Sequence, residues 1–372
     1  ALSVKYTYFT NGIETYSSTF DVNIAPQSSQ EYEIDSLELE KDNHNSVVFE
    51  YLAGDFLIAS EQIILSEGKL SADINSDGKT TVKPSENKLY ITFDNGSMIF
   101  DKSTGFITSY IYKNHEMINS FPLGDFKGFA PAFYRAPLDN DRNICKYWHT
   151  MGLQNTSNIC KGSSFTDNGD NIVVTTNIKS IANCILPVAN TQIKYTIYPN
   201  GNILVDVNCL GGGAVKLLPR FGVMLEMPKE YENIKYFGLG EDVNLPDYKE
   251  HTINKVYQIT VDKLKEDYIK PQESATRCDV RFAEITNASG FGLRFEAVSK
   301  PFVFSASHYT SNQWAKAMHR DDLVDLPTTC VNIDSSVLGA GSNACGPLPD
   351  KKDRVGSLSG KKLSFVVKPI GE

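Results

Sequence analysis

Apolar and polar residues alternate along short runs throughout the chain. In these runs β-branched and aromatic residues occupy every second position, as in segments 3–9, 19–24, 31–34, 47–52, 89–93 and 202–207. Alternation with a period of two predicts half-buried β-strands. No segment keeps a helical period of 3.6 beyond about two turns. The pattern therefore predicts an all-β fold.

Turn-forming residues separate the runs in pairs. Asn11-Gly12, Asn95-Gly96 and Asn200-Gly201 each stand between two alternating runs. Such dipeptides favour the tight turns of β-hairpins because their residues tolerate a positive φ. Antiparallel sheets packed as sandwiches are therefore expected, and not parallel βαβ units.

A polar stretch divides the chain into two units. Residues 67–88 are rich in Ser, Asp, Asn, Gly and Lys, which is typical of a linker. Residues 1–66 hold about five strand-like runs and predict a small immunoglobulin-like sandwich, possibly truncated because a complete one has about seven strands. Residues 89–372 are too long for a common seven-stranded sandwich and predict a large antiparallel super-sandwich.

Charge and composition argue against nucleic acids and membranes as partners. The net charge is -9 and basic residues are dispersed, so no nucleic acid is expected as a partner. No apolar run approaches the ~20 residues needed to cross a bilayer, so no membrane association is expected. The start of the sequence has no signal-peptide pattern.

The cysteines point to no disulfide framework. There are seven of them, an odd number, with irregular spacing and neither a CxxC pair nor a Cys/His set at zinc spacing. No cofactor or metal site is expected in this chain. Reducing conditions favour the cytoplasm, and a periplasmic or secreted location stays open.

Nine motifs in the second unit carry a resemblance when taken together and in order. They are Phe100–Gly105, Phe133–Asp141, Trp148–Leu153, Leu218–Gly222, Gly238–Asp247, Pro271–Arg281, His319–Leu323, Val331–Asp334 and Gly339–Pro347. Their order and spacing resemble the C-terminal small-chain domain of the large β-galactosidases of glycoside hydrolase family 2. Segments 24–26 and 59–62 resemble the immunoglobulin-like domain that precedes it in those enzymes.

The resemblance implies a fold and a context. The small-chain domain of such enzymes is a super-sandwich similar to galactose mutarotases. It packs against a catalytic (β/α)-barrel and forms part of the wall of the galactoside pocket. Retaining glycosidases use two carboxylates about 5–5.5 Å apart, and in this family both come from the barrel. We therefore expect no catalytic residue here and no hydrolysis by this chain alone, although the parent protein would be a retaining β-galactosidase.

The first candidate site is the heptapeptide Arg135–Asp141. Pro137 fixes its own φ and keeps Ala136 extended, so the segment is expected to be a rigid turn. Carboxylates and amides suit the hydroxyls of a sugar, and an arginine can hold them in place. We expect Arg135, Asp139, Asn140 and Asp141 to bind substrate at the pocket. The alternative is that Arg135 pairs with Asp139 or Asp141 inside the turn and that nothing binds.

Cys345 is the second candidate for substrate binding. Well-known members of the family carry a tryptophan at this position, which stacks on the sugar, and cysteine offers no such platform. The alternative is a small packing residue.

Three further sets of residues have two interpretations each. The loop with Glu241, Asp242, Asn244 and Asp247 either faces a saccharide or is structural, and we favour the structural interpretation. Even spacing places Glu273, Arg277 and Asp279 on one face of a strand, as a recognition cluster or, preferably, an ion-pair ladder. His308 and His319 are candidate titratable groups of a mutarotase-type site or, preferably, ordinary polar residues.

Three functions compete at this stage. In the first, the chain is the non-catalytic C-terminal part of a β-galactosidase, with the catalytic barrel of the parent chain and the galactoside substrate as its partners. In the second it is a stand-alone carbohydrate-binding module. In the third it is a mutarotase-like epimerase that uses a carboxylate base and a histidine acid. An apolar barrel-facing surface would also make a homo-oligomer possible.

Overall fold

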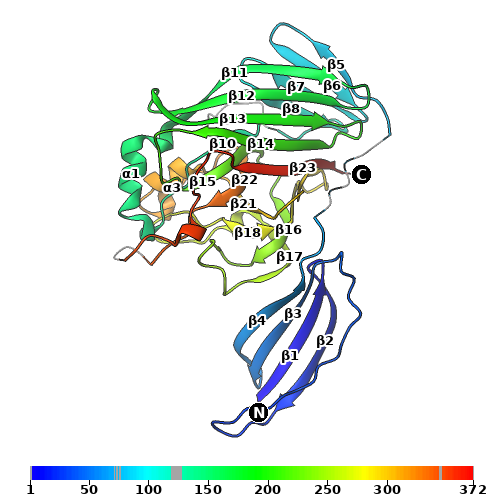
Figure 1. The fold of residues 1–372 in the computed structure, drawn as a ribbon, viewed down its shortest axis with the longest axis vertical. Coiled ribbons are helices and arrows are strands. Elements are labelled where there is room, and N and C mark those ends of the chain that lie inside the picture. Colours follow the sequence, from blue (N-terminus) through cyan, green and yellow to red (C-terminus); the bar gives the residue numbers. More distant parts are fainter. Residues whose placement is uncertain are drawn as a thin grey trace.

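The computed structural model describes residues 2–70, 72, 74, 77–118, 128–342 and 346–371. Among these residues the strands form four sheets, and all their pairings are antiparallel. A small N-terminal sheet stands below a larger β body in Figure 1. The predicted all-β antiparallel fold is confirmed. No helix among the described residues is long and apolar enough to cross a membrane.

The N-terminal unit consists of one four-stranded sheet in the order β2-β1-β3-β4. Its strands are β1 (Leu2–Thr10), β2 (Ile13–Val22), β3 (Asn45–Ala53) and β4 (Phe56–Ser66). The Asn11-Gly12 turn joins β1 to β2 as predicted, and both residues have a positive φ. A complete immunoglobulin-like sandwich has two sheets, and one is present among the described residues of this unit.

The segment 31–34, which the pattern predicts as a strand, forms no strand in the structure. Side chains hold it against the sheet instead. The hydroxyls of Tyr6 and Tyr16 each donate to the Asp35 carboxylate at 2.6 Å, and the Tyr8 hydroxyl donates to the Asp35 carbonyl at 2.8 Å. Ile34 packs onto the aromatic face of the sheet. The segment has the alternation of a strand, but it contacts the sheet through side chains and not through a strand pairing.

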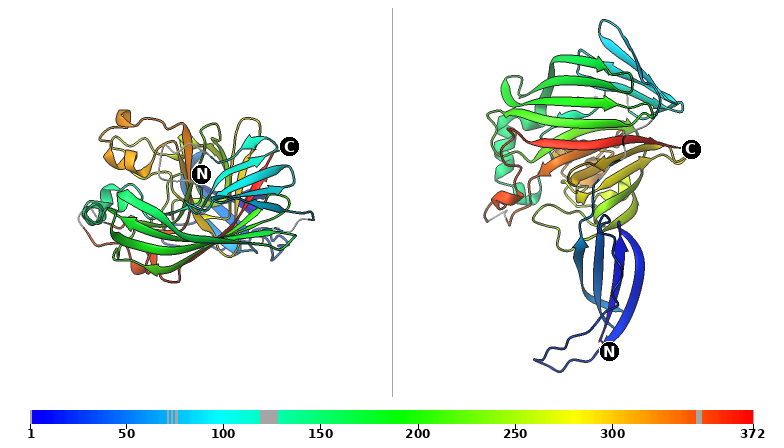
Figure 2. Two further views of the ribbon diagram at one scale, coloured as in Figure 1. Left: turned by 90° about the horizontal axis from the view of Figure 1, so that it is seen from above. Right: turned by 45° about the vertical axis from the view of Figure 1, so that its right-hand side comes forward.

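The larger body has a nine-stranded sheet in the order β11-β12-β13-β14-β23-β20-β19-β16-β17. Its strands are β11 (Thr156–Asp167), β12 (Ile172–Ala182), β13 (Leu186–Ile197), β14 (Ile203–Gly212), β16 (Asn233–Gly240), β17 (Ile253–Thr260), β19 (Phe282–Thr286), β20 (Gly292–Ala297) and β23 (Lys362–Ile370). Two five-stranded sheets lie against this layer (Figure 2). The body is thus a super-sandwich in which the second layer is divided.

The first five-stranded sheet has the order β10-β15-β22-β21-β18 and is called here the inner sheet. It contains β10 (Ala130–Ala132), β15 (Arg220–Pro228), β18 (Arg277–Val280), β21 (Phe302–Ser307) and β22 (Thr328–Val337). The second contains β5 (Thr81–Pro84), β6 (Lys88–Phe93), β7 (Gly96–Asp101), β8 (Phe106–Tyr112) and β9 (His115–Glu116). Since β5 lies inside the predicted linker 67–88, part of that polar stretch belongs to the body.

Helices are short and lie between strands. They are η1 (Asp139–Asp141), α1 (Ile144–Met151), η2 (Leu153–Asn155), α2 (Val261–Leu264), α3 (Ser311–Lys316), η3 (Arg320–Asp322) and η4 (Lys351–Asp353). The longest, α1, spans about two turns, in line with the predicted lack of longer helical periodicity.

One apolar core fills the space between the layers of the body. Phe100 of β7 packs edge-on against Tyr195 of β13, with ring centroids 6.1 Å apart. Phe304 of β21 stacks on Tyr236 of β16 at 6.5 Å. Each covering sheet therefore buries one apolar face against the nine-stranded sheet, which explains the period-two pattern of the sequence.

Hydrogen bonds to the backbone of β17 join the N-terminal sheet to the body, and some of them come from a side-chain amide. The Gln62 amide donates to the Asn254 carbonyl at 2.9 Å and accepts the Asn254 N–H at 2.6 Å, as a neighbouring strand would. The Gly12 carbonyl accepts the Val256 N–H at 2.8 Å. A Cβ on Gly12 would lie 2.7 Å from the Phe237 ring, so this glycine serves both the turn and the close approach.

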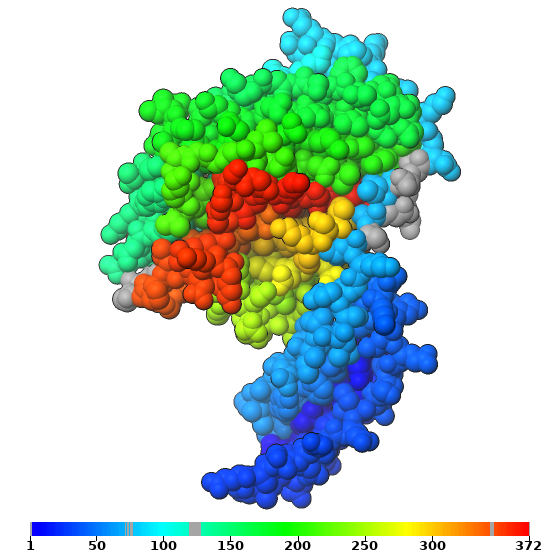
Figure 3. Space-filling view, in the orientation of Figure 1, coloured from blue at the N-terminus to red at the C-terminus, as the bar shows by residue number. Residues whose placement is uncertain are grey.

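The N-terminal unit projects from the body (Figure 3). Its edge strand β4 is rich in apolar residues and mostly exposed. Phe56, Ile58 and Ile63 are 71%, 54% and 47% exposed. An exposed apolar edge strand is a template for pairing with another chain. We expect the 372-residue chain to self-associate through β4, and the double substitution Ile58→Lys with Ile63→Lys to shift it towards monomer.

Light scattering over a concentration series would measure this association. Ile185→Lys is the matched control, because Ile185 is 85% exposed on the body, away from β4. A wild-type chain that stays monomeric at high concentration, or an equal effect of the control, would contradict the prediction.

Candidate functional site

Arg135 and Asp141 bond to each other inside the turn that follows β10. Both side chains are buried. The Arg135 Nη1 donates to Asp141 Oδ2 at 2.6 Å, and the same oxygen accepts the Leu138 N–H at 2.8 Å. The Arg135 guanidinium also lies 5.6 Å from the centroid of the Trp148 ring. The internal pairing considered from the sequence is present, and these two residues hold the turn together.

Asp139 and Asn140 occupy a different position in the same turn. Asp139 is exposed and donates its N–H to the Gln272 Oε1 at 2.8 Å. Asn140 is half-buried and donates its amide to the Gly341 carbonyl at 2.8 Å. Of the four predicted residues in this turn, these two lie where a ligand can reach. Their binding of a galactoside stays a prediction.

The loop after β22 lies beside this turn. Arg135 Nη2 donates to the Leu338 carbonyl at 3.3 Å, across 203 positions of sequence. The Asp247 carboxylate accepts the N–H groups of Ala340 and Gly341 at 2.7 and 2.8 Å. Asp247 therefore fixes the loop. Cys345, the other predicted substrate-binding residue, lies outside the described residues, so its role also stays a prediction.

The loop after β16 completes the arrangement. Asn244 is buried, accepts the Cys278 N–H at 2.6 Å and donates to the Asp242 carbonyl at 3.0 Å. Beneath it a small apolar cluster joins side chains from all three loops, namely Leu138, Leu239, Leu245, Cys278, Val303, Val337 and Ala340. We call segments 138–141, 244–248 and 338–342 together the loop platform. The structural roles of Asn244 and Asp247 match the preferred interpretation of their loop.

The predicted ion-pair ladder of Glu273, Arg277 and Asp279 is wrong. The buried Arg277 guanidinium donates to three backbone carbonyls, those of Thr276, Glu241 and Leu264. Asp279 has a φ of 53° and pairs with Lys249 at 2.8 Å. The positive φ breaks the alternation of the strand, so even spacing does not place these side chains together.

A buried charge cluster, missed from the sequence, lies on the inner sheet. Arg220 Nε is 3.2 Å from Asp334 Oδ2, and its Nη2 is 4.0 Å from Glu273 Oε2. Asp334 lies opposite Gly222 in the register, where a Cβ would come within 2.3 Å of its Oδ1. The only sequence signal is a pair of polar residues at period two, Asn332 and Asp334, within a buried strand.

This cluster leaves no room for a sugar. Burial raises the pKa of Asp334 to about 7, assisted by the Glu273 carboxylate and opposed by the Arg220 guanidinium. The adjoining cavity, lined by Glu273, Ser305 and Asn332 among others, has a volume of about 20 Å³, enough for about one water molecule. His308 is buried and its Nδ1 lies 3.2 Å from the Thr328 carbonyl, while His319 is exposed.

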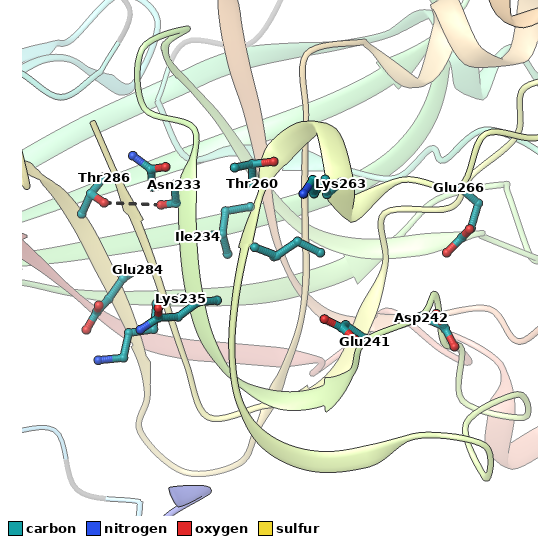
Figure 4. Close-up of a pocket in the computed structure, with 12 residues that line it drawn as sticks. Asn233, Ile234, Lys235, Glu241, Asp242, Thr260, Lys263, Glu266, Glu284 and Thr286 are labelled. Atoms are coloured by element: carbon teal, nitrogen blue, oxygen red, sulfur yellow. Dashed lines mark hydrogen bonds between the residues drawn. The ribbon is translucent and has the colours of Figure 1, made fainter. Parts of the chain in front are cut away.

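A larger groove of about 790 Å³ lies along β16 and β17 (Figure 4). It is lined by charged residues of both signs, including Lys235, Lys263, Glu241 and Glu284. The described residues that line it include no aromatic side chain, so they provide no flat apolar face on which a sugar ring could stack. The described residues also contain no group of three or more His, Cys, Asp or Glu side chains placed to hold a metal.

Comparison with known proteins finds β-galactosidases, both by family model and by sequence identity. The family model described as β-galactosidase small chain matches residues 92–367. A β-galactosidase of Actinobacillus pleuropneumoniae is 28% identical over 360 residues, covering 93% of this chain and 34% of the relative. One of Halalkalibacterium halodurans is 25% identical over 359 residues, covering 92% and 34%. The chain thus spans about a third of the length of these relatives.

Comparison with solved structures matches a galactose 1-epimerase from Lactobacillus acidophilus. It has a TM-score of 0.46 and 9% identity and covers 79% of this chain and 99% of its own. A GalM/aldose epimerase homologue from C. elegans has a TM-score of 0.45 and 10% identity, covering 78% and 99%.

The buried Arg135–Asp141 pair is testable through stability. Asp141→Asn leaves the Arg135 charge buried without its partner, so we expect a loss of about 3–5 kcal/mol in the free energy of unfolding. Asp139→Asn, in the same turn but exposed, is the control and should change it by no more than about 0.5 kcal/mol. Urea unfolding followed by tryptophan fluorescence measures both. Equal effects would show that the pair does not hold the turn.

Asp334 should make stability depend on pH. Its folded pKa of about 7 lies above its ordinary value of 3.8, so the folded state binds this proton more tightly than the unfolded state. The stability from this proton is full below about pH 4 and is lost as the pH rises through 7. Between pH 5 and 8 we expect wild type to lose about 1–3 kcal/mol relative to Asp334→Asn, which cannot titrate. Thermal unfolding of both proteins at each pH measures it, and parallel pH curves would contradict it.

Proposed function

The chain belongs to the β-galactosidase small-chain family, and we propose that it is the C-terminal, non-catalytic part of a β-galactosidase. The observation that carries this proposal is the partial coverage. The chain matches β-galactosidases over more than nine-tenths of its own length but over 34% of theirs. The remaining two-thirds of such an enzyme leave ample room for a catalytic (β/α)-barrel, which contributes both reacting carboxylates.

The geometry of the buried Asp334 and Glu273 carboxylates supports a non-catalytic role. A retaining glycosidase needs two carboxylates about 5–5.5 Å apart with the glycosidic bond between them. Asp334 and Glu273 flank Arg220, but the cavity beside them measures about 20 Å³. A sugar ring does not fit there. The same restriction weighs against a mutarotase-like epimerase on this face of the sheet, because such an enzyme must place a hexose against its base.

The loop platform is the surface that we assign to the galactoside pocket. One buried charge pair, an arginine-to-carbonyl bond and two carboxylate-to-backbone bonds connect its three loops. It presents Asp139 at its surface beside the half-buried Asn140. A loop surface held by such bonds, with polar groups at its outer side, is suited to positioning a substrate whose reacting bond is held by another domain.

Activity measurements test this assignment. The chain alone should not hydrolyse an aryl β-galactoside, whereas combining it with the separately produced preceding part of its parent enzyme should restore turnover. In the combined enzyme, Asp139→Ala or Asn140→Ala should raise KM by about 5- to 30-fold through lost hydrogen bonds. Asp170→Asn, in an exposed turn of the body, is the control.

Turnover by the chain alone would overturn the non-catalytic role. Unchanged KM in both platform variants would overturn the assignment of the platform to the pocket.

A further inference from the structure

A depression in which all the charged residues are basic lies at the start of β23. The loop between η4 and β23 forms it together with the connection between β20 and β21. Its volume is about 470 Å³, and its charged side chains are Lys300, Lys361 and Lys362. The other described residues that line it are four serines and a glycine. We call this surface the lysine depression. Three cations without a carboxylate stand out in a chain of net charge -9.

The three lysines form no ion pair with another described residue. Elsewhere on the nine-stranded sheet lysines are paired, as Lys368 is with Glu296 at 2.6 Å. The Asp206 carboxylate accepts the hydroxyl of Ser364, which lines the depression, at 2.7 Å. Asp206 is already paired with Lys194 at 3.6 Å. The positive charge of the lysine depression is therefore left uncompensated by the described residues.

Lys361 is held in place although it lies beside another cation. Its Nζ donates to the Ser336 Oγ at 3.0 Å, and its side chain is half-buried. Its backbone carbonyl accepts the Cys209 N–H at 2.9 Å. Burial and the neighbouring Lys300 ammonium lower the pKa of Lys361, because each disfavours a second positive charge. An anion beside the two ammonium groups would relieve this repulsion.

Serine hydroxyls add neutral donors to the same surface. The side chains of Ser299, Ser357 and Ser359 line the depression and make no hydrogen bond to another described residue. The Gly360 N–H donates to the Cys209 carbonyl at 2.8 Å and so fixes the loop that carries two of these serines. A phosphoryl group carries nearly two negative charges at neutral pH and three acceptor oxygens. It matches this set of donors better than a carboxylate, which has one charge and two oxygens.

We propose that the lysine depression binds the phosphoryl group of inorganic phosphate or of a phosphate monoester. The ammonium groups of Lys300, Lys361 and Lys362 neutralise its charge and donate to its oxygens, and the serine hydroxyls donate to the oxygens that remain. No residue of the loop platform lines the depression. The site needs neither the galactoside pocket nor a catalytic barrel, so its test is independent of the proposed function.

Phosphorus NMR measures this binding directly in the 372-residue chain. At about pH 7.5, where the phosphoryl group is mostly a dianion, the resonances of inorganic phosphate and of D-glucose 6-phosphate should shift saturably with added protein. A dissociation constant of about 1–10 mM is expected for so small a ligand. The ionic strength is kept constant, because salt screens exposed charges. The tighter ligand of the two shows whether free phosphate or a phosphorylated sugar suits the site better, and either order supports the proposal.

Variants decide whether the signal belongs to this depression. Lys300→Gln and Lys361→Gln should each weaken binding about three- to tenfold, and the double variant about tenfold or more. Lys300→Arg keeps the charge and should retain the affinity within about twofold. Lys161→Gln removes an exposed lysine of β11 outside the depression and is the control. Thermal unfolding checks that each variant is folded.

The absence of a saturable shift with both phosphate compounds would overturn the proposal. Equal affinity in wild type, Lys300→Gln and Lys361→Gln would overturn it too, as would an equal loss in Lys161→Gln, which would show attraction to the surface in general. Acetate that displaces phosphate as well as phosphate itself would overturn the assignment to a phosphoryl group. Asp139→Ala should leave phosphate binding unchanged, so failure here leaves the galactoside assignment standing, and the converse also holds.

Discussion

The loop platform depends on the hydrogen bonds that the buried guanidinium of Arg135 donates. A guanidinium cannot lose its proton and must find acceptors when it is removed from water. Arg135 finds them in Asp141, in Ala136 of its own turn and in Leu338, 203 positions along the chain. One side chain thus sets the distance between two loops that the sequence separates widely. Asp247 then attaches a third loop through two backbone N–H groups.

The inner sheet also buries charged and polar side chains, and these contact one another instead of joining loops. Its face towards the nine-stranded sheet is apolar and belongs to the main core. Its other face carries Arg220, Glu226, Asn332 and Asp334, all buried. Covering segments close this face almost completely and leave a cavity of about 20 Å³. The polar groups there contact one another, as Arg220 does with Asp334 and Glu273.

The N-terminal sheet has one covered face and one exposed edge strand. One aromatic face is covered by the segment around Asp35, which three tyrosine hydroxyls hold in place. The edge strand β4 stays exposed. The unit is nevertheless fixed to the body, because Gln62 and Gly12 provide the bonds of a neighbouring strand to β17.

The sequence by itself determined the local features of this protein. Period-two alternation and Asn-Gly turns depend on neighbouring residues only, so the all-β fold and the hairpin turns were predictable, and the ordered motifs identified the family. Only the tertiary structure decided which strands pair and which charges meet. It left segment 31–34 unpaired, turned Arg277 towards carbonyls, joined Arg220 to Asp334 and placed Trp314 beside a cavity. These outcomes depend on contacts between residues far apart in sequence, and on the requirement that buried polar groups find partners, which no local pattern encodes.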